Sequence, residues 1–114
     1  MDASVALSEL FGVSTQVVEA VVTGPGGEVE AARTSSGARA TTLAWAGAEL
    51  LSTVGAIRDG EPVERVQIDL DGRSLVALTD GARTVVATTV AQPTSALVAH
   101  DLRTALARIG TGAR

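Results

Sequence analysis

Residues 63–90 read VERVQIDLDGRSLVALTDGARTVVATTV, three short apolar segments separated by two Asp-Gly pairs. The segments 63–70, 74–79 and 84–90 are rich in Val, Leu and Thr, which favours strands. Asp71-Gly72 and Asp80-Gly81 predict the connecting turns, because Asp-Gly is typical of type I′ hairpins, in which both central residues need positive φ. This stretch therefore predicts a three-stranded antiparallel meander.

A second hairpin is predicted nearer the N-terminus. Residues 16–23 (QVVEAVVT) are short and β-branched, as in a strand. Gly24-Pro25-Gly26-Gly27 predicts a turn, and residues 28–32 alternate like a returning strand. The chain should thus contain five strands.

Three helices are expected around these strands. Residues 4–11 form a short amphipathic segment, and residues 38–57 follow Thr34-Ser35-Ser36-Gly37, which supplies capping side chains. A last helix should open at Pro93-Thr94-Ser95 and end near Gly110 as its C′ residue. Its apolar positions recur at helical spacing: Val98, Leu102, Ala105 and Ile109. The order α-β-β-α-β-β-β-α predicts an α+β fold, one five-stranded antiparallel sheet with helices packed on it.

Length and composition bound the possible functions. The chain has 114 residues and a mass of 11.5 kDa, so we expect a single domain over 1–114 with its ordered core at about 4–110. The net charge is −4, which disfavours binding to nucleic acid or to an anionic membrane surface. The absence of Cys and Lys excludes thiol chemistry, cysteine zinc sites and a Walker A lysine. The acidic start, MDAS, is unlike a signal peptide, so a cytoplasmic location is expected.

The middle helix carries two apolar stripes when it is plotted at 100° per residue. The first should contact the sheet: Leu43, Gly47, Leu50, Val54 and Ile57. The second lies beside it: Ala40, Ala44, Ala48, Leu51 and Gly55. Together they cover about half the circumference, wider than the ~100° that a surface helix needs. Three interpretations compete: a helix well buried within a monomer, a transmembrane span, and a helix buried by its sheet on one side and by a partner on the other.

The remaining arc of this helix holds the one Trp of the chain. Trp45, Glu49 and Ser52 lie on it, and Glu49 is its one charged residue. Trp is enriched among interface anchors because it combines a large apolar area with a polar N–H. The arc is therefore a candidate partner-binding surface, unless Trp45 folds back along the edge of the sheet.

Several segments resemble the Roadblock/dynein light chain family of small-GTPase-associated proteins, in its bacterial branch. The resemblance lies in Gly12-Val13 followed by the strand 18–22 (VEAVV), in Gly26-Gly27, in the Leu- and Ala-rich middle helix, and in residues 97–103 (LVAHDLR). It covers nearly the whole chain and rests on element order and apolar pattern. The all-Arg, Ala-rich composition is typical of a high-GC bacterium such as an actinobacterium.

The resemblance implies an α/β/α sandwich of the Roadblock-like (profilin-like) type and a homodimer formed through the middle helix and third strand. The third strand would contribute Val66, Ile68 and Leu70, beside the second stripe of the helix. It also implies a non-catalytic module that binds a small Ras-like GTPase, for which Trp45, Glu49 and Ser52 are the candidate contacts, with a sensor-kinase-like protein as a possible further partner. A small-molecule sensor domain of related shape is the alternative.

No segment predicts catalysis, a cofactor or a metal. Asp69-Leu70-Asp71-Gly72 superficially resembles a calcium loop, but the residues that follow predict a strand rather than further ligands. Gly24-Pro25-Gly26-Gly27 lacks the Gly-Lys-Ser/Thr ending of a phosphate loop. His100 should face solvent on the last helix, and Asp101 lies about 100° away from it.

Overall fold

The computed structural model describes residues 1–112 and has the predicted element order. The elements are α1 (Ala3–Val13), β1 (Val17–Thr23), β2 (Val29–Arg33), α2 (Gly37–Ile57), β3 (Arg65–Leu70), β4 (Arg73–Thr79), β5 (Thr84–Thr89) and α3 (Ser95–Gly112). The domain predicted over 1–114 therefore ends in two residues that lie outside the described part of the chain.

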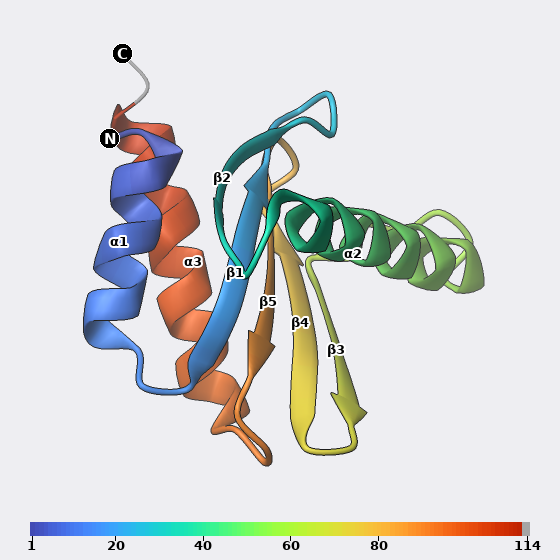
Figure 1. Ribbon diagram of the computed structural model, residues 1–114. Helices are drawn as coiled ribbons and strands as arrows, with labels where there is room; N and C mark the ends of the chain where they lie inside the picture. Colours follow the sequence, from blue (N-terminus) through green and yellow to red (C-terminus); the bar gives the residue numbers. More distant parts are fainter. Residues whose placement is uncertain (113–114) are drawn as a thin grey trace.

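The five strands form one antiparallel sheet in the order β2-β1-β5-β4-β3. Helices α1 and α3 pack side by side on one face, and α2 crosses the other (Figure 1). The predicted α/β/α sandwich is thus confirmed. Strands β2 and β3 form the two edges of the sheet, so within residues 1–112 no strand lies on the outer side of β3.

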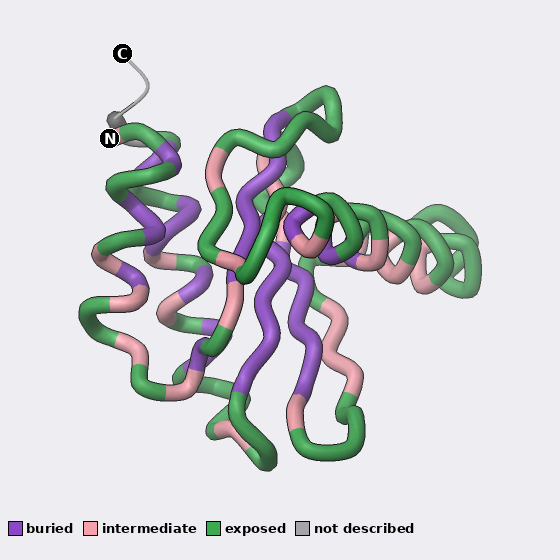
Figure 2. Tube along the Cα trace, in the orientation of Figure 1, coloured by how far each residue is buried: buried purple, intermediate pink, exposed green. Residues whose placement is uncertain are grey.

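Each central strand has apolar side chains on both faces, so the two cores are separated by the sheet. Ala20 and Val22 of β1 pack under α1 and α3, whereas Val21 between them packs under α2. Val85 and Val86 of β5 alternate in the same way. The core under α1 and α3 is the larger, and it contains the whole predicted stripe of α3, namely Val98, Leu102, Ala105 and Ile109. The sheet is consequently buried along its middle strands (Figure 2).

Capping side chains fix where two helices begin. Asp2 Oδ1 accepts a hydrogen bond of 2.9 Å from the Val5 N–H at the start of α1. Ser36, one of the predicted caps, accepts 3.1 Å from the Arg39 N–H through its Oγ at the start of α2. Such bonds satisfy N–H groups that lack a partner in the first helical turn.

One local prediction was wrong, and two others were confirmed but differ from the structure in detail. Gly110 is not the C′ residue of the last helix, because α3 continues to Gly112. The first helix is longer than the predicted 4–11, spanning Ala3–Val13. Both Asp-Gly turns join adjacent strands as expected, but only Gly72 and Gly81 have positive φ, of 83° and 96°. A type I′ turn needs two such residues, so neither turn is of that type.

No helix in residues 1–112 combines the length and the apolar run that crossing a bilayer requires.

Candidate partner-binding surfaces on α2 and β3

The N-terminal half of α2 is fixed on the sheet by small and apolar residues. Ala40, Leu43 and Gly47 are its buried residues, and they share a core with Val86 of β5. A Cβ added to Gly47 would overlap Val86 Cγ2, so at this position the backbone of α2 lies too close to the sheet to leave room for a side chain. Gly47 therefore marks the point where α2 crosses the sheet.

A polar network attaches the first turn of α2 to the sheet. Arg39 Nε and Nη2 donate to Glu19 Oε2 and Oε1 of β1 at 3.0 and 2.9 Å. Thr88 Oγ1 and Arg73 Nη1 also donate to Glu19 Oε1, at 2.9 and 3.3 Å. The hydrogen bond from Arg39, together with Thr88 and the charge of Arg73, holds the pKa of Glu19 below its ordinary value, although partial burial opposes this. The charged carboxylate thus ties α2 to three strands.

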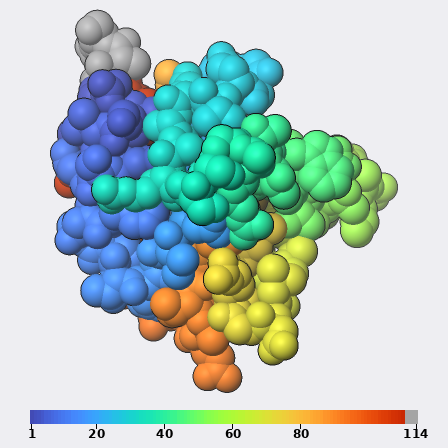
Figure 3. Space-filling model, viewed as in Figure 1, coloured from blue at the N-terminus to red at the C-terminus, as the bar shows by residue number. Residues whose placement is uncertain are grey.

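The C-terminal part of α2 runs out past the edge of the sheet (Figure 1), and we call residues 48–57 the α2 overhang, of which Leu50 and Leu51 still pack against the core. Leu50, Leu51 and Val54 are half-buried on its inner side. Ile57, predicted to contact the sheet, is 75% exposed, so that prediction was wrong. The end of α2 lies out past the edge of the sheet, which accounts for this exposure (Figure 1). Figure 3 shows the green surface of the overhang projecting past the yellow β4.

The residues of the second stripe differ in exposure, from buried in the core to open to solvent. Ala40, proposed from the sequence as an interface residue, is 5% exposed and belongs to the core with Leu43, which leaves little of it for a partner. Ala44 and Leu51 are half-buried, and Ala48 is exposed. A Cβ added to Gly55 would meet no atom within 4 Å. The accessible part of the stripe is therefore Ala44, Ala48, Leu51 and Gly55.

The apolar side chains of β3 lie on the same side of the sheet as α2. Val66 and Ile68 pair with Ala77 and Leu75, both of which belong to the core under α2. Val66 and Ile68 are half-buried, and Leu70 is 52% exposed. The structure thus brings the α2 overhang and the apolar face of edge strand β3 together on one side of the molecule.

The third candidate surface points away from the sheet, and we call it the docking face: Trp45, Glu49 and Ser52. The spacing of four and three residues places them on one side of α2, and all three are exposed. Trp45 is 65% exposed, so it does not fold back along the edge of the sheet. Threonines border this face, and Thr42 Oγ1 is occupied by a 3.0 Å bond to the Ala38 carbonyl.

The segments considered for other chemistry have structural roles. Asp69 Oδ1 accepts hydrogen bonds from Ser74 Oγ and Gln67 Nε2 at 2.7 and 3.1 Å within the β3–β4 hairpin. In the loop between β1 and β2, the Gly26 N–H donates 2.9 Å to Glu28 Oε1. His100 is exposed on α3. Within residues 1–112, no three His, Asp or Glu side chains gather as a metal site would require.

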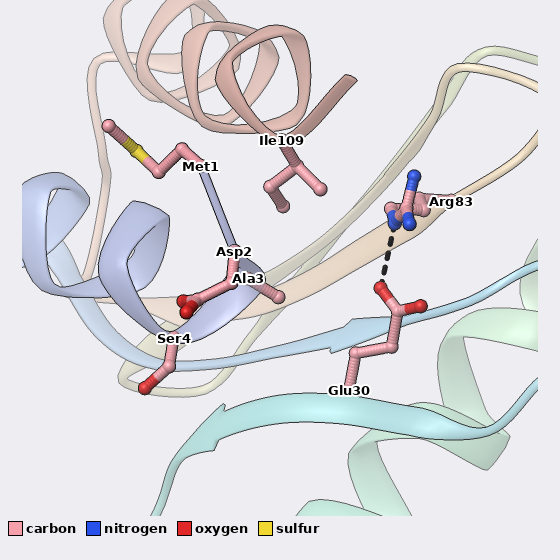
Figure 4. Close-up of a pocket in the computed structure, with 7 residues that line it drawn as sticks. All are labelled: Met1, Asp2, Ala3, Ser4, Glu30, Arg83 and Ile109. Atoms are coloured by element: carbon pink, nitrogen blue, oxygen red, sulfur yellow. Dashed lines mark hydrogen bonds and ion pairs between the residues drawn. The ribbon is translucent and has the colours of Figure 1, made fainter. Parts of the chain in front are cut away.

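A cavity of about 600 Å³ lies at the start of α1 (Figure 4). Met1, Ala3 and Ile109 line it beside the ion pair of Glu30 with Arg83, whose Nε lies 2.7 Å from Glu30 Oε1. It lies on the α1 and α3 side of the sheet, away from the surfaces described above.

Sequence reasoning missed the Glu19 network. Its members are Glu19, Arg39, Arg73 and Thr88, which lie on four different elements. The only local signal was a charged residue inside an apolar strand, which by itself does not identify partners.

No family model and no curated protein matches the sequence. Two structures of Roadblock/LC7 domains from Streptomyces avermitilis match the fold. One has a TM-score of 0.83 at 19% identity and covers 97% of each chain. The other has a TM-score of 0.72 at 20% identity and covers 91% of this chain and 94% of that one.

Myxococcus xanthus MglB also matches, with a TM-score of 0.65 at 10% identity, over 90% of this chain and 77% of that one. The chain therefore has the Roadblock/LC7 fold, as the resemblance in its sequence implied.

Proposed function

We propose that this chain forms a non-catalytic homodimer that binds a small Ras-like GTPase and regulates or scaffolds it. The observation that carries the proposal is the juxtaposition of the α2 overhang and the apolar side of edge strand β3, which lie uncovered next to each other. The Roadblock/LC7 fold, shared also with MglB, supports a GTPase-associated regulatory role.

A second copy of the chain would cover both surfaces at once. An unpaired edge strand can add another strand, and here the added strand would be β3 of the partner. In a two-fold interface the same patch occurs on both chains, so each overhang would lie over the partner's β3. Ile57 and Leu70, at 75% and 52% exposure, would then lose contact with water.

The small residues of the second stripe suit this contact. Ala48 and Gly55 present no bulky side chain, so two α2 helices can approach each other closely. The overhang carries a single charged residue, Glu49, which lies on the docking face rather than on the stripe. Few charges would therefore need to be desolvated when the helices pack together.

The docking face would stay accessible in such a dimer, because it lies on the side of α2 that faces away from the sheet. It borders the second stripe but is not part of it. Trp45 supplies a rigid apolar anchor, Ser52 a short polar side chain, and Glu49 a charge that can select a partner. We assign this face to the GTPase. A cytoplasmic location and a sensor-kinase-like third partner remain part of the proposal.

Binding of a GTPase tests this function. A small Ras-like GTPase is loaded with GDP or with a non-hydrolysable GTP analogue and titrated with wild-type protein and Trp45→Ala. Loss of an anchoring Trp should weaken binding at least thirtyfold, or about 2 kcal/mol. His100→Ala, exposed on α3 across the sheet, is the control and should bind like wild type. An affinity of Trp45→Ala within threefold of wild type would remove Trp45 from the interface.

A further inference from the structure

The hydrogen bonds of the β3–β4 hairpin determine which residues of β3 face the free edge. The Thr79 N–H donates 2.9 Å to the Glu64 carbonyl, and these two residues precede the registered pairs that start with Arg65 and Leu78. In antiparallel pairs, hydrogen-bonded and non-hydrogen-bonded positions alternate. Val66, Ile68 and Leu70 therefore bond to β4, whereas the N–H and C=O groups of three residues point away from it: Arg65, Gln67 and Asp69.

From this pattern we infer the register in which two copies of β3 pair, an inference that rests on the homodimer proposed above. The two-fold axis passes at Gln67, so Gln67 lies opposite Gln67 of the second copy. Arg65 then lies opposite Asp69 of the second copy, and the same pair repeats on the other side of the axis. On the α2 side of the sheet, Val66 lies opposite Ile68 in both halves.

Backbone pairing favours this register over its neighbours. With the axis at Gln67, all three edge residues find an edge residue opposite, and each such pair can exchange two N–H···O bonds. Moving the axis to Ile68 leaves Arg65 opposite Asp71, which lies in the β3–β4 turn. Moving it to Val66 leaves Asp69 opposite Val63, before β3 begins. Each shift therefore loses pairing at one end of the strand.

Charge complementarity favours the same register over the axis at Val66, which would place Arg65 opposite Gln67. Opposite charges directly across two strands stabilise a pair, and like charges destabilise it. Arg65 and Asp69 occupy the two ends of the edge ladder, so pairing about Gln67 brings a cation against an anion twice. The apolar side of β3 taken alone favours the axis at Ile68, which pairs Val66 with Leu70 twice and Ile68 with itself. With the axis at Gln67, Val66 pairs with Ile68 twice and Leu70 lies opposite Glu64, so the choice of register rests on the backbone pairing.

Asp69 keeps one carboxylate oxygen without a hydrogen-bond donor in the described chain. Ser74 Oγ and Gln67 Nε2 both donate to its Oδ1, and Oδ2 accepts no hydrogen bond from any residue between 1 and 112. These two donors hold the pKa of Asp69 below its ordinary value, which keeps the carboxylate charged. Arg65 is exposed and makes no ion pair within the described chain. Both groups are thus available at the edge.

Single cysteines test the register, since the natural chain has no Cys. With the axis at Gln67, the two copies of Gln67→Cys face each other with Cα atoms about 5.5 Å apart, within reach of a disulfide. The two copies of Ile68→Cys are then diagonal and lie beyond the ~7 Å limit. Mild oxidation should link the Gln67→Cys chains into a covalent dimer and leave the Ile68→Cys chains largely unlinked. The reverse pattern would overturn the register.

Exchanging the charges of Arg65 and Asp69 gives a second test of the register, which does not depend on disulfide geometry. Arg65→Asp alone and Asp69→Arg alone each place like charges at both ends of the seam and should weaken self-association at least tenfold. Mixing the two variants pairs an acidic strand with a basic one at both ends, so a heterodimer should form within about threefold of wild-type affinity. Failure to recover on mixing would contradict the register. A wild-type chain that is monomeric in light scattering would instead overturn the homodimer itself.

Discussion

Arg39 and Glu19, twenty residues apart in the sequence, form a two-point ion pair of 3.0 and 2.9 Å that joins the first turn of α2 to β1. Together with the close approach of Gly47 to Val86, it fixes two points along α2 and hence the direction of the helix across the sheet. That direction carries the C-terminal end of α2 past the edge of the sheet and creates the surface to which we assign the dimer.

We expect Glu19→Gln to lower the free energy of unfolding by about 1–3 kcal/mol at pH 7, because charge-assisted hydrogen bonds in a mostly buried position are lost. Glu61→Gln is the matched control, since Glu61 pairs with Arg58 on the surface and should change stability by less than about 1 kcal/mol. Urea unfolding followed by circular dichroism measures both. Equal effects of the two variants would show that the Glu19 network does not anchor α2.

The same carboxylate predicts a pH dependence. The pKa of Glu19 is lower in the folded chain than its ordinary value of 4.5, so the unfolded chain binds the proton more readily. Its contribution to stability is therefore complete above pH 4.5 and is lost as the pH falls through the lower folded value. The difference in unfolding free energy between wild type and Glu19→Gln should shrink from about pH 6 toward about pH 3. A difference that stays constant over this range would contradict the assignment.

Gly47→Ala and Gly55→Ala should differ, although both replace a glycine within α2. An added methyl at Gly47 overlaps Val86, and overpacking of this kind costs about 1–3 kcal/mol. At Gly55 the methyl meets no atom of the same chain, so the monomer should gain some helix stability, up to about 1 kcal/mol. Thermal unfolding of the two variants side by side checks this. A Gly47→Ala protein as stable as wild type would mean that α2 can move away from the sheet without a loss of stability.

Ala48→Arg should dissociate the homodimer, because it introduces a long charged side chain into the contact between two α2 helices. We expect the dissociation constant to rise at least tenfold. Thr53→Arg is the control, since Thr53 is also exposed on the overhang but lies away from the second stripe. Sedimentation of both variants over a range of concentrations measures the effect. Equal association of the two would place the interface elsewhere.

The chain alone should bind no GTP. It contains no Lys to contact the phosphates, and its Gly-rich segment at residues 24–27 precedes a strand rather than a helix. Calorimetric titration with GTP and Mg²⁺ should show no heat of binding. An affinity in the micromolar range would contradict this prediction.

The fold could be predicted from the sequence because the patterns that indicate its strands, turns and helices are local. The two Asp-Gly pairs separate the strands of the meander, and the spacing of Val98, Leu102, Ala105 and Ile109 identifies the buried side of α3. The Roadblock/LC7 structures confirm the resulting architecture. The glycine-led turns show the limit of such signals, since Gly72 and Gly81 mark where the chain reverses but not the turn type.

The exposure of α2 could not be predicted in the same way. A helical wheel gives the relative directions of Ala40 and Ile57 but not the length of helix that the sheet covers. Because α2 crosses the sheet obliquely and continues past β3, Ala40 lies in the core while Ile57 is open to solvent. Glu19 and its partners are joined only by tertiary structure, which no local pattern encodes.

The mass of the protein in solution tests the central claim most directly. Light scattering coupled to size exclusion, at micromolar concentration and neutral pH, measures it without a label or a partner. We predict a single species of twice the 11.5 kDa chain mass, formed through the α2 overhang and the edge of β3. A species of 11.5 kDa under these conditions would contradict the homodimer and leave the exposed apolar surfaces of α2 and β3 to a different partner.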